Sequence, residues 1–512
     1  MSLAVLLNTL LKSAVLLFWG YFLANEYVRW KRRIPGLKGP RGLPVIGNLL
    51  HVTKTFSAEQ YRRWSLRYGP VYQVQLGNTP IVVVNSTESA KTLFLNQGGA
   101  LISRPLFYVL HKVVSKNVAS IGTSPWDESC RLRRKVAAGA LNRPKVQSYE
   151  PFILRETRDF IEELTRESRN GRTEVGFKST VHRLALNLVL RLNYGTRVAN
   201  TTDLKEDALY SEIIEVEDEI SRFRSPSKNL TNYIPLLRVL EPLVWKKSAA
   251  HSADIGRRRI AYNNILFGQL LKAIDENTDV PCIQGNVLRD PEAAGLSSNE
   301  QLSISLSMIA GADSTQPTIA WAILFLGHRQ DIQQRAFAEI QTHLGSAYQP
   351  TATLEVEYIH ALVKEFMRFY TVLPLAMPRE TTAPVQVNGQ VIPAGTMVFL
   401  NAWACNRDPL TFEDPWTFKP ERWLDDTEKL THQFAFGYGS RMCPASHLAS
   451  RLVYSVLFHL IASFEIQPAE GEGDEIIDPI QGLKDPTSLA AIPKGSRARF
   501  VPRADNAPTD LT

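Results

Sequence analysis

The spacing of apolar residues along the chain predicts a protein that is mostly helical. In several stretches apolar side chains recur every three or four positions, which places them on one face of a helix. These stretches are residues 57–68, 129–141, 155–168, 300–326, 331–344, 362–370 and 448–460. The pattern therefore indicates a mainly α fold.

A smaller part of the chain follows the pattern of β-strands. Residues 71–76 alternate between apolar and polar side chains, and 81–84 form a short β-branched run after a Gly-Asn pair. This arrangement predicts a hairpin. Two more strands are expected at 385–391 and 397–400. The fold class is therefore mainly α with a minor β portion.

The first part of the chain has the composition of a membrane helix. Residues 3–24 are nearly all apolar, and about 20 such residues span a bilayer. Lys12 interrupts the run, but its long side chain can reach the interface. The basic cluster at 29–33 follows the apolar run, whereas a cleaved signal peptide carries its charges before it. We therefore expect an uncleaved, single-pass transmembrane helix with the body of the protein in the cytosol.

Proline and glycine are dense directly after the basic cluster, which predicts a stiff, irregular neck that decouples the anchor from the body. No comparable linker divides the rest of the chain. We expect a membrane anchor and basic flank at 1–33, a neck at 34–50, one large domain at 51–503 and a tail at 504–512. The apolar residues within 233–245 fit either core packing or a second contact with the membrane surface.

Composition and charge exclude several classes of protein. Hydrophobic residues make up 44% and charged residues 21% of the 512 positions, as in ordinary globular proteins. Four scattered cysteines are too few for a disulfide framework, which suggests a reducing compartment. The formal charge of +7 is dispersed, without interleaved aromatic residues, so we expect no nucleic acid as a partner.

One of the four cysteines has unusual surroundings. In the segment FGYGSRMCPA, Gly437 and Gly439 permit a tight turn, Arg441 adds a cation, and Cys443 precedes the apolar stretch 448–460. A thiol at the N-terminus of a helix ionises easily. An isolated cysteine would more often be a buried, inert core residue. The loop around Cys443 favours a chemical role instead.

Two further sets of polar residues stand out, one by its spacing and one by its place in an apolar helix. Glu365 and Arg368 are three residues apart on one helix face, and Arg422 follows in the segment PERW. Asp313, with its neighbouring hydroxyl residues, lies inside the long apolar helix at 300–326. Taken alone, Glu365 and Arg368 would be a surface pair worth well under ~1 kcal/mol. Polar groups inside an apolar helix need partners or a function, so Asp313 and its neighbours form a candidate site.

These three segments, in this order and separation, resemble those of the cytochrome P450 family. The resemblance implies a cytochrome P450 fold preceded by an N-terminal transmembrane helix, with haem b as cofactor and Cys443 as the axial thiolate ligand of its iron. The domain at 51–503 would then be a haem-binding monooxygenase domain. A thiolate ligand favours cleavage of the dioxygen bond.

The resemblance also implies roles for individual residues. The haem-binding loop would contain Phe436, Gly437 and Gly439, and Arg441 and Arg379 would contact the haem propionates. The family's third contact comes from a Trp-x-x-x-Arg pair, but here Trp126 is followed by Cys130. Arg133 would lie on the face of Trp126. Alternatively, Arg131, Arg133 and Arg134 form a basic docking surface for a reductase.

In the family, the distal helix carries an acid and an alcohol that relay protons. The corresponding residues are Asp313 and Ser314, with Thr315 as the second candidate hydroxyl. The structural alternative is that both hydroxyls bond to carbonyls of the preceding turn. Glu365, Arg368 and Arg422 would form a buried structural ion-pair network.

The resemblance further implies partners and a location. Dioxygen is a substrate, and two electrons must come from outside. No Gly-x-Gly-x-x-Gly motif for a nicotinamide or flavin is present in the sequence, so NADPH would act through a separate NADPH-cytochrome reductase. The expected location is the endoplasmic reticulum membrane, in contact with membrane lipid, with the catalytic domain facing the cytosol.

Several segments look like those of fungal phenylacetate hydroxylases and of relatives that oxidise cresols. Among them are TSPWDESC, PCIQGN and IQQRAFAEI. A small aromatic substrate with one ring is implied. We favour m-cresol or hydroxybenzyl alcohol in fungal secondary metabolism, because Ser314 and Ala445 depart from the family pattern. A phenylacetate or hydroxyphenylacetate ring hydroxylase is the alternative, and its carboxylate substrate would need Lys112, Arg222 or Arg224.

The substrate pocket is expected along five segments, and two remoter functions stay open. The segments are 101–121, 221–224, 308–314, 372–377 and 486–489. The remoter functions are a haem-thiolate isomerase or dehydratase that needs no reductase, and a haem protein without turnover. Activity that is undiminished without reductase would favour the first of these.

We expect Cys443→Ala to abolish the red-shifted carbon-monoxide spectrum of the reduced protein, because that spectrum depends on a thiolate ligand to haem iron. Difference spectra of the purified variant and of the wild type provide the measurement. Retention of the band in the variant would contradict the assignment of Cys443.

Overall fold

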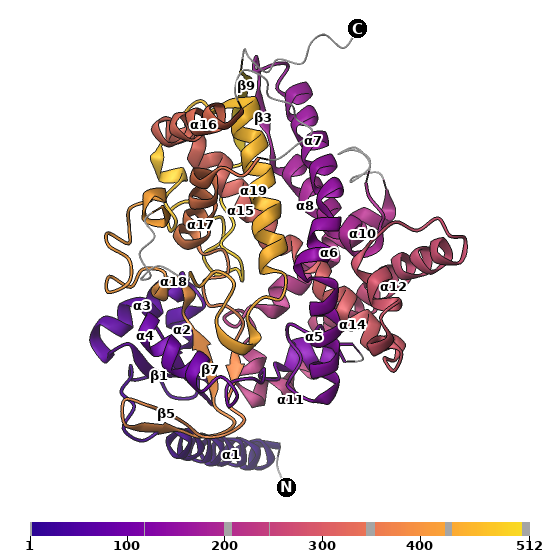
Figure 1. Cartoon of the computed structure of the whole chain (residues 1–512). Helices are drawn as coiled ribbons and strands as arrows, with labels where there is room; N and C mark the ends of the chain where they lie inside the picture. Colours follow the sequence, from indigo (N-terminus) through magenta and orange to yellow (C-terminus); the bar gives the residue numbers. More distant parts are fainter. Residues whose placement is uncertain are drawn as a thin grey trace.

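A computed structural model of the chain describes residues 3–116, 118–198, 207–244, 246–344, 354–424 and 433–503. Helices form most of the molecule, and the small sheets lie toward its lower left and upper edges (Figure 1). The helices are α1 (Leu3–Arg32), α2 (Leu49–Val52), α3 (Ser57–Tyr68), α4 (Thr87–Ala90), η1 (Lys91–Asn96), η2 (Tyr108–Val114), α5 (Glu128–Ala140), α6 (Arg143–Ser148), α7 (Glu150–Glu167), α8 (Lys178–Tyr194), α10 (Ala208–Arg224), η3 (Leu230–Asn232), α11 (Pro235–Val244), α12 (Lys246–Asp275), α13 (Ile283–Leu288), η4 (Pro291–Ala293), α14 (Ser298–Ile309), α15 (Ala312–His328), α16 (Gln330–Leu344), α17 (Glu357–Tyr370), α18 (Ala402–Cys405), η5 (Pro420–Trp423), η7 (Gly439–Arg441), α19 (Ser446–Ser463) and η8 (Asp474–Ile476).

The strands form three small sheets. One has the order β1-β2-β7-β4, the second β3-β9-β8, and the third is the hairpin β5-β6. The strands are β1 (Val71–Leu76), β2 (Thr79–Val84), β3 (Glu174–Gly176), β4 (Arg379–Glu380), β5 (Val385–Val387), β6 (Gln390–Ile392), β7 (Met397–Leu400), β8 (Phe464–Pro468) and β9 (Arg497–Pro502). Strands β1 and β2 pair antiparallel, which confirms the predicted first hairpin.

Most of the predicted helices are present, but the long helix at 300–326 is wrong. It is divided into α14, which ends at Ile309, and α15, which begins at Ala312. Pro317 lies in α15, where it cannot donate to the carbonyl of Asp313 and its ring crowds that carbonyl. The break places the Ala310–Gly311 turn beside the cavity described below.

The predicted strand at 385–391 is also wrong, because it is the two-stranded hairpin β5-β6. Its turn contains Asn388 and Gly389, which have φ angles of 50° and 73°. Both are positive, the backbone conformation that tight hairpin turns with an Asn-Gly sequence require. The Asn-Gly pair in the sequence was the signal for this turn.

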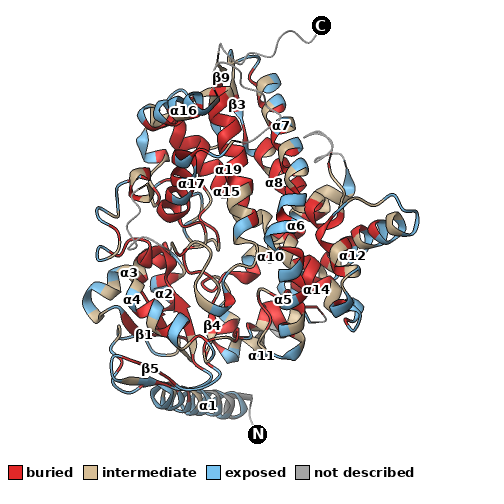
Figure 2. Ribbon diagram, in the orientation of Figure 1, coloured by how far each residue is buried: buried red, intermediate tan, exposed pale blue. Residues whose placement is uncertain are grey.

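The core lies where α15, α17 and α19 pack together (Figure 2). Trp321 and Tyr370 are fully buried and stack with their ring centroids 4.3 Å apart. Phe325 and Phe418 lie next to this pair, and their own ring centroids are 4.0 Å apart. These rings pack α15 against α17 and against the segment that carries Phe418.

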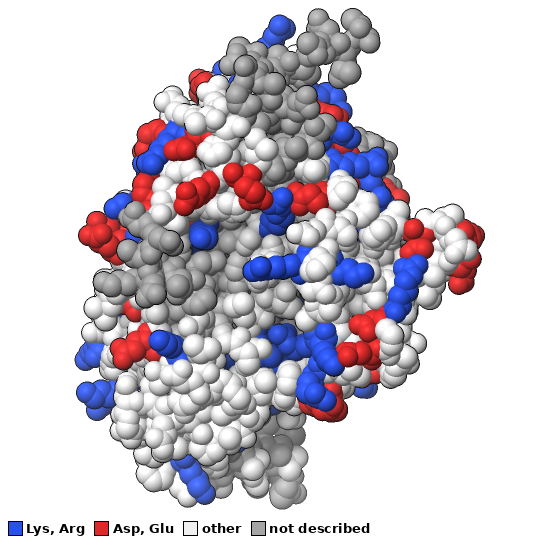
Figure 3. All heavy atoms as spheres, in the orientation of Figure 1, with Lys and Arg blue, Asp and Glu red and all other residues white. Residues whose placement is uncertain are grey.

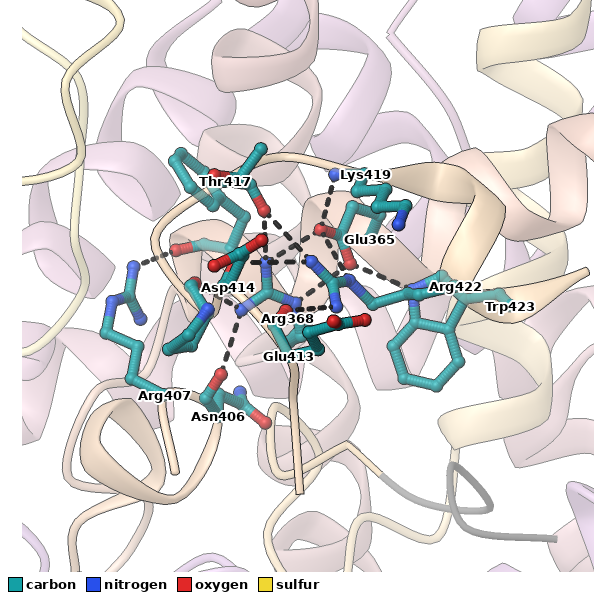
Figure 4. Close-up of polar contacts among 12 residues, drawn as sticks. Glu365, Arg368, Asn406, Arg407, Glu413, Asp414, Thr417, Lys419, Arg422 and Trp423 are labelled. Atoms are coloured by element: carbon teal, nitrogen blue, oxygen red, sulfur yellow. Dashed lines mark hydrogen bonds and ion pairs between the residues drawn. The ribbon is translucent and has the colours of Figure 1, made fainter. Parts of the chain in front are cut away.

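A buried carboxylate holds α17 to the segment that precedes the Cys443 loop (Figure 4). The Glu365 carboxylate is 2.7 Å from Arg368 and 3.2 Å from Arg422, and it also accepts hydrogen bonds from the Lys419 amide and the Trp423 indole. Arg368 donates to the carbonyls of Asn406, Pro415 and Thr417. The network thus joins α17 to residues 406–423.

The N-terminal helix α1 is the one helix among the described residues that is long and apolar enough to cross a membrane. Its end is attached to the body. Arg29 donates to the carbonyls of Gly77 and Leu43, and Glu26 accepts a hydrogen bond from the Val45 amide. Both partners of the Glu26–Arg29 ion pair are therefore held by the hairpin turn and the neck. The structure differs here from the expectation of a decoupled anchor.

The surface around α1 is poor in charge. The lower part of the face in Figure 3, over β1 and β5, carries few Lys, Arg, Asp or Glu side chains. Within 233–245, Tyr233 is buried, whereas Leu236 and Val239 of α11 are 38% and 68% exposed. This segment therefore contributes both to the core and to an apolar surface; Trp245 lies outside the described residues.

We expect Glu365→Gln to destabilise the fold by about 3–5 kcal/mol, because the substitution leaves two buried guanidinium groups without their carboxylate. Urea unfolding followed by circular dichroism provides the measurement. Glu128→Gln is the matched control, since Glu128 forms an exposed pair with Arg131 on α5. Equal unfolding midpoints for the two variants would contradict the role of Glu365.

Candidate active site

A cavity of about 300 Å³ lies between the α14–α15 break and the loop that carries Cys443. Its walls are mostly apolar, with few polar groups, which is typical of a cofactor or ligand site. Three of the five expected segments contribute to it, whereas 221–224 and 486–489 do not line it. Helix α8 and Ile283 form part of the wall that the sequence did not indicate. The lining includes Ile121, Leu188, Val189, Leu192, Met308, Ala310, Gly311, Ser314, Thr315, Val372, Leu373, Ala376, Phe436, Gly437, Cys443, Pro444, Ala445 and Leu448.

The loop around Cys443 owes its shape to two glycines. Gly437 and Gly439 have φ angles of 74° and 72°, and a Cβ on Gly439 would lie 1.9 Å from the carbonyl oxygen of Phe94. The Cys443 amide donates to the carbonyl of Phe436 at 3.0 Å, which closes the turn. Helix α19 begins at Ser446, so Cys443 precedes the helix rather than opening it.

The protein alone does not make Cys443 a thiolate. Burial raises the pKa of its thiol above the ordinary value, although the Ala445 amide and the Arg134 charge act in the opposite direction. A coordinated metal cation ionises a thiol outright. In the described part of the chain, no group of three His, Cys, Asp or Glu residues could hold a bare metal ion. Cys443 therefore fits a metal whose other ligands come from a cofactor.

Four arginines line the cavity, namely Arg104, Arg134, Arg379 and Arg441, and no carboxylate from the described residues lies among them. Burial and the repulsion between these cations lower the pKa of Arg379 to about 9, and burial is likewise the main cause that lowers the pKa of Arg441 to about 10. The site thus contains a surplus of buried positive charge. Its natural complement is an anionic ligand.

The hydrogen bonds of these arginines leave donors available. Arg441 donates to the carbonyls of Ile102, Ile121 and Ser124, but its buried Nε has no acceptor in the described structure. Arg379 donates to the carbonyls of Leu101 and Tyr438. Backbone carbonyls orient the guanidinium groups without neutralising them. The two propionates of haem b would supply the missing negative charge, so the residues present fit this cofactor.

On the opposite wall, Ser314 and Thr315 both face the cavity. Both hydroxyls donate to the Gly311 carbonyl, at 3.2 and 3.0 Å, as the structural alternative from the sequence describes. Asp313 does not line the cavity. It forms an ion pair with Arg224 at 3.0 Å, and burial raises its pKa to about 7.

Comparison with known proteins decides the family. The sequence model of the cytochrome P450 family matches residues 37–492, most of the chain. The chain belongs to the cytochrome P450 family. It is 46% identical to the 3-hydroxyphenylacetate 6-hydroxylase of Emericella nidulans over 94% of this chain and 92% of that protein. It is also 40% identical to the phenylacetate 2-hydroxylase of the same organism, over 94% and 93% of the two chains.

As a P450, the protein is an oxidoreductase that incorporates molecular oxygen, and it uses haem b with electrons from a separate NADPH-dependent reductase. A more distant relative is a cytochrome P450 monooxygenase of Mycosarcoma maydis, 38% identical over 96% of this chain and 93% of that protein. Similarity therefore covers the whole catalytic domain.

In this P450, Cys130 stands four residues after Trp126, where the family usually has an arginine. Arg133 was expected to replace that arginine, and the structure shows that this expectation was wrong. Arg133 does not line the cavity and donates to the Ser303 hydroxyl of α14 and the Ala119 carbonyl. Trp126 precedes α5, so helical spacing from it did not apply. Arg134, one turn beyond Cys130, lines the cavity instead.

Trp126 still contacts the site through an arginine. The guanidinium of Arg441 lies over the Trp126 ring at 5.6 Å. Arg104 was not singled out from the sequence, although it lies within the expected wall segment 101–121. It donates to the carbonyls of Gly122, Met377 and Pro378, so it links its own segment to residue 122 and to residues 377–378.

We expect Arg134→Ala to speed haem loss about tenfold, because a charge-assisted hydrogen bond in a half-buried site contributes about 1.5 kcal/mol. Transfer of haem to excess apomyoglobin gives the rate. Arg131→Ala serves as the control, since Arg131 on the same helix is exposed and paired with Glu128. Identical rates for the two variants would remove Arg134 from the cofactor site.

Proposed function

We propose that this P450 hydroxylates the aromatic ring of an arylacetate of the hydroxyphenylacetate type. The observation that carries the proposal is the 46% identity, over nearly the whole chain, to a 3-hydroxyphenylacetate 6-hydroxylase. The second relative also acts on a phenylacetate. This replaces m-cresol as the favoured substrate, since the departures at Ser314 and Ala445 do not bear on the charge of the substrate.

The geometry of the site agrees with an arylacetate. Apolar side chains such as Val189, Leu192 and Met308 provide a surface for an aromatic ring. Of the three cations considered for the carboxylate, Lys112 and Arg222 are exposed, and Arg222 is paired with Glu219. Arg224 is 5% exposed and, although it does not line the cavity, it pairs with Asp313, the neighbour of the cavity-lining Ser314. It is therefore the member of the set that a buried carboxylate could use.

The residues would divide the chemistry as follows. Cys443 would hold haem b, which would supply the activation of dioxygen with electrons from the reductase. The four cavity arginines would hold the propionates and so orient the cofactor. Asp313 stores a proton, and the Ser314 hydroxyl, or that of Thr315, passes it into the cavity. The apolar wall excludes bulk water, which prevents unproductive proton delivery.

The proposed location is the endoplasmic reticulum membrane, with α1 as a single span and the catalytic domain facing the cytosol. The basic residues at 29–33 follow the span and favour this orientation. We further propose the division into an anchor at 1–33, a neck at 34–50, a monooxygenase domain at 51–503 and a tail at 504–512. NADPH-cytochrome reductase on the same membrane would be the electron donor.

We expect 3-hydroxyphenylacetate and phenylacetate to shift the purified protein from low spin to high spin and to be hydroxylated in the presence of NADPH and reductase. Spectral titration and product analysis provide the measurements, with m-cresol and 3-hydroxybenzyl alcohol as neutral comparison compounds. Turnover of the neutral compounds alone would contradict the arylacetate proposal. Product formation that does not require reductase would contradict the monooxygenase reaction.

A further inference from the structure

A charge cluster that is buried apart from Asp313, whose side chain is 20% exposed, lies behind the distal wall of the cavity and joins three helices. It contains Arg224 and Glu217 of α10, Arg259 of α12 and Asp313 of α15. Glu217 is fully engaged, since it accepts hydrogen bonds from Arg259 at 2.7 Å and from the Tyr262 hydroxyl at 2.6 Å. Two cations and two carboxylates balance each other.

Arg224 is the member of this cluster that has unused capacity. Its Nη1 donates to Asp313 at 3.0 Å, whereas its Nη2 lies 3.7 Å from Glu217 and has no hydrogen-bond partner in the described structure. The side chain is 6% exposed. A guanidinium group can bind carboxylates with several donors, so an unpartnered buried Nη2 is a place for another acceptor.

The cluster also adjoins the cavity wall through Asp313. Asp313 directly precedes Ser314, which lines the cavity, and Arg224 is the last residue of α10. A carboxylate that reached Arg224 from the cavity would enter beside the Asp313 carboxylate. The cluster would then contain three negative charges for two positive ones.

We propose that Nη2 of Arg224 binds the carboxylate of the arylacetate substrate, and that Asp313 takes up one proton from solvent as this carboxylate binds. The inference rests on the proposed substrate class. The proton, released by solvent, forms an O–H bond on the Asp313 carboxylate and restores the charge balance of the cluster, and no other covalent bond changes. Asp313, which precedes Ser314, is then protonated, so the binding of an acidic substrate provides the proton that Ser314 passes on.

The electrostatic surroundings of Asp313 support the coupling. Burial raises its pKa to about 7, Arg224 opposes that shift, and Glu217 and Asp218 of α10 reinforce it, while Arg259 of α12 again opposes it. On α8, His182 faces Asp218, and burial lowers its pKa. A further carboxylate beside Arg224 can only raise the pKa of Asp313 further.

The test compares 3-hydroxyphenylacetate with 3-hydroxyphenylacetamide, a neutral compound of nearly the same shape, by spectral titration. In Arg224→Met, the dissociation constant of the acid should rise at least tenfold while that of the amide changes less than twofold. Arg222→Gln, two residues earlier on the same helix, should change neither. Equal effects of Arg224→Met on the acid and the amide would overturn the proposal and leave Nη2 to a water molecule.

The pH dependence provides a second readout that does not need the Arg224 variant to fold. For the wild type, the dissociation constant of the acid should be constant below pH 7 and rise about tenfold per pH unit above it, because one proton is taken up. The amide should show no such rise. In Asp313→Asn the rise should disappear for the acid, and its persistence would overturn the proposal.

These outcomes separate the inference from the proposed function. If the wild-type protein binds and hydroxylates 3-hydroxyphenylacetate, but neither variant changes the preference for the acid or its pH dependence, the function stands and the role of Arg224 fails. If the wild-type protein binds only neutral phenols, the proposed function itself fails.

Discussion

The site is organised by buried positive charge that the protein does not neutralise. Four arginines surround an apolar cavity, and their hydrogen bonds go to backbone carbonyls rather than to carboxylates. Their guanidinium groups repel one another and are poorly hydrated, a cost that the fold alone does not offset. An anionic cofactor relieves it. Binding of the cofactor and completion of the fold are therefore energetically linked, since a ligand that binds only the folded state stabilises that state.

A charged network lies on each side of the cavity, and the two networks differ in whether a donor is left without a partner. On the Cys443 side, Glu365 pairs with two buried arginines and fixes the segment that leads to the loop. The backbone carbonyl of Asn406 accepts a hydrogen bond from Arg368, and its side-chain oxygen accepts one from the Phe434 amide. On the distal side, the charges of the cluster of Arg224, Glu217, Arg259 and Asp313 balance, but Nη2 of Arg224 has no hydrogen-bond acceptor in the described structure. The Glu365 network therefore makes the Cys443 side rigid, whereas the cluster with Arg224 can bind a charged ligand.

The sequence predicted the features that depend on local pattern. Helical periodicity, the first hairpin and the tight glycine turn before Cys443 all follow from neighbouring residues. The break between α14 and α15 was missed, although Pro317 and the hydroxyl residues were visible as unusual. The choice of Arg134 over Arg133 depends on where α5 begins relative to Trp126. The Arg224–Asp313 pair joins residues 89 positions apart, which no local pattern reveals.

The attachment of α1 through Glu26 and Arg29 has a mechanical consequence. A protein on a free tether can swivel above the bilayer and present any side to lipid or to a reductase. With α1 as the span proposed above, the span and the body would turn together, so the tilt of the helix would set the height of the catalytic domain above the membrane. An encounter between enzyme and reductase then becomes a search in two dimensions between partners of nearly fixed orientation, in which few collisions are wasted on the wrong face.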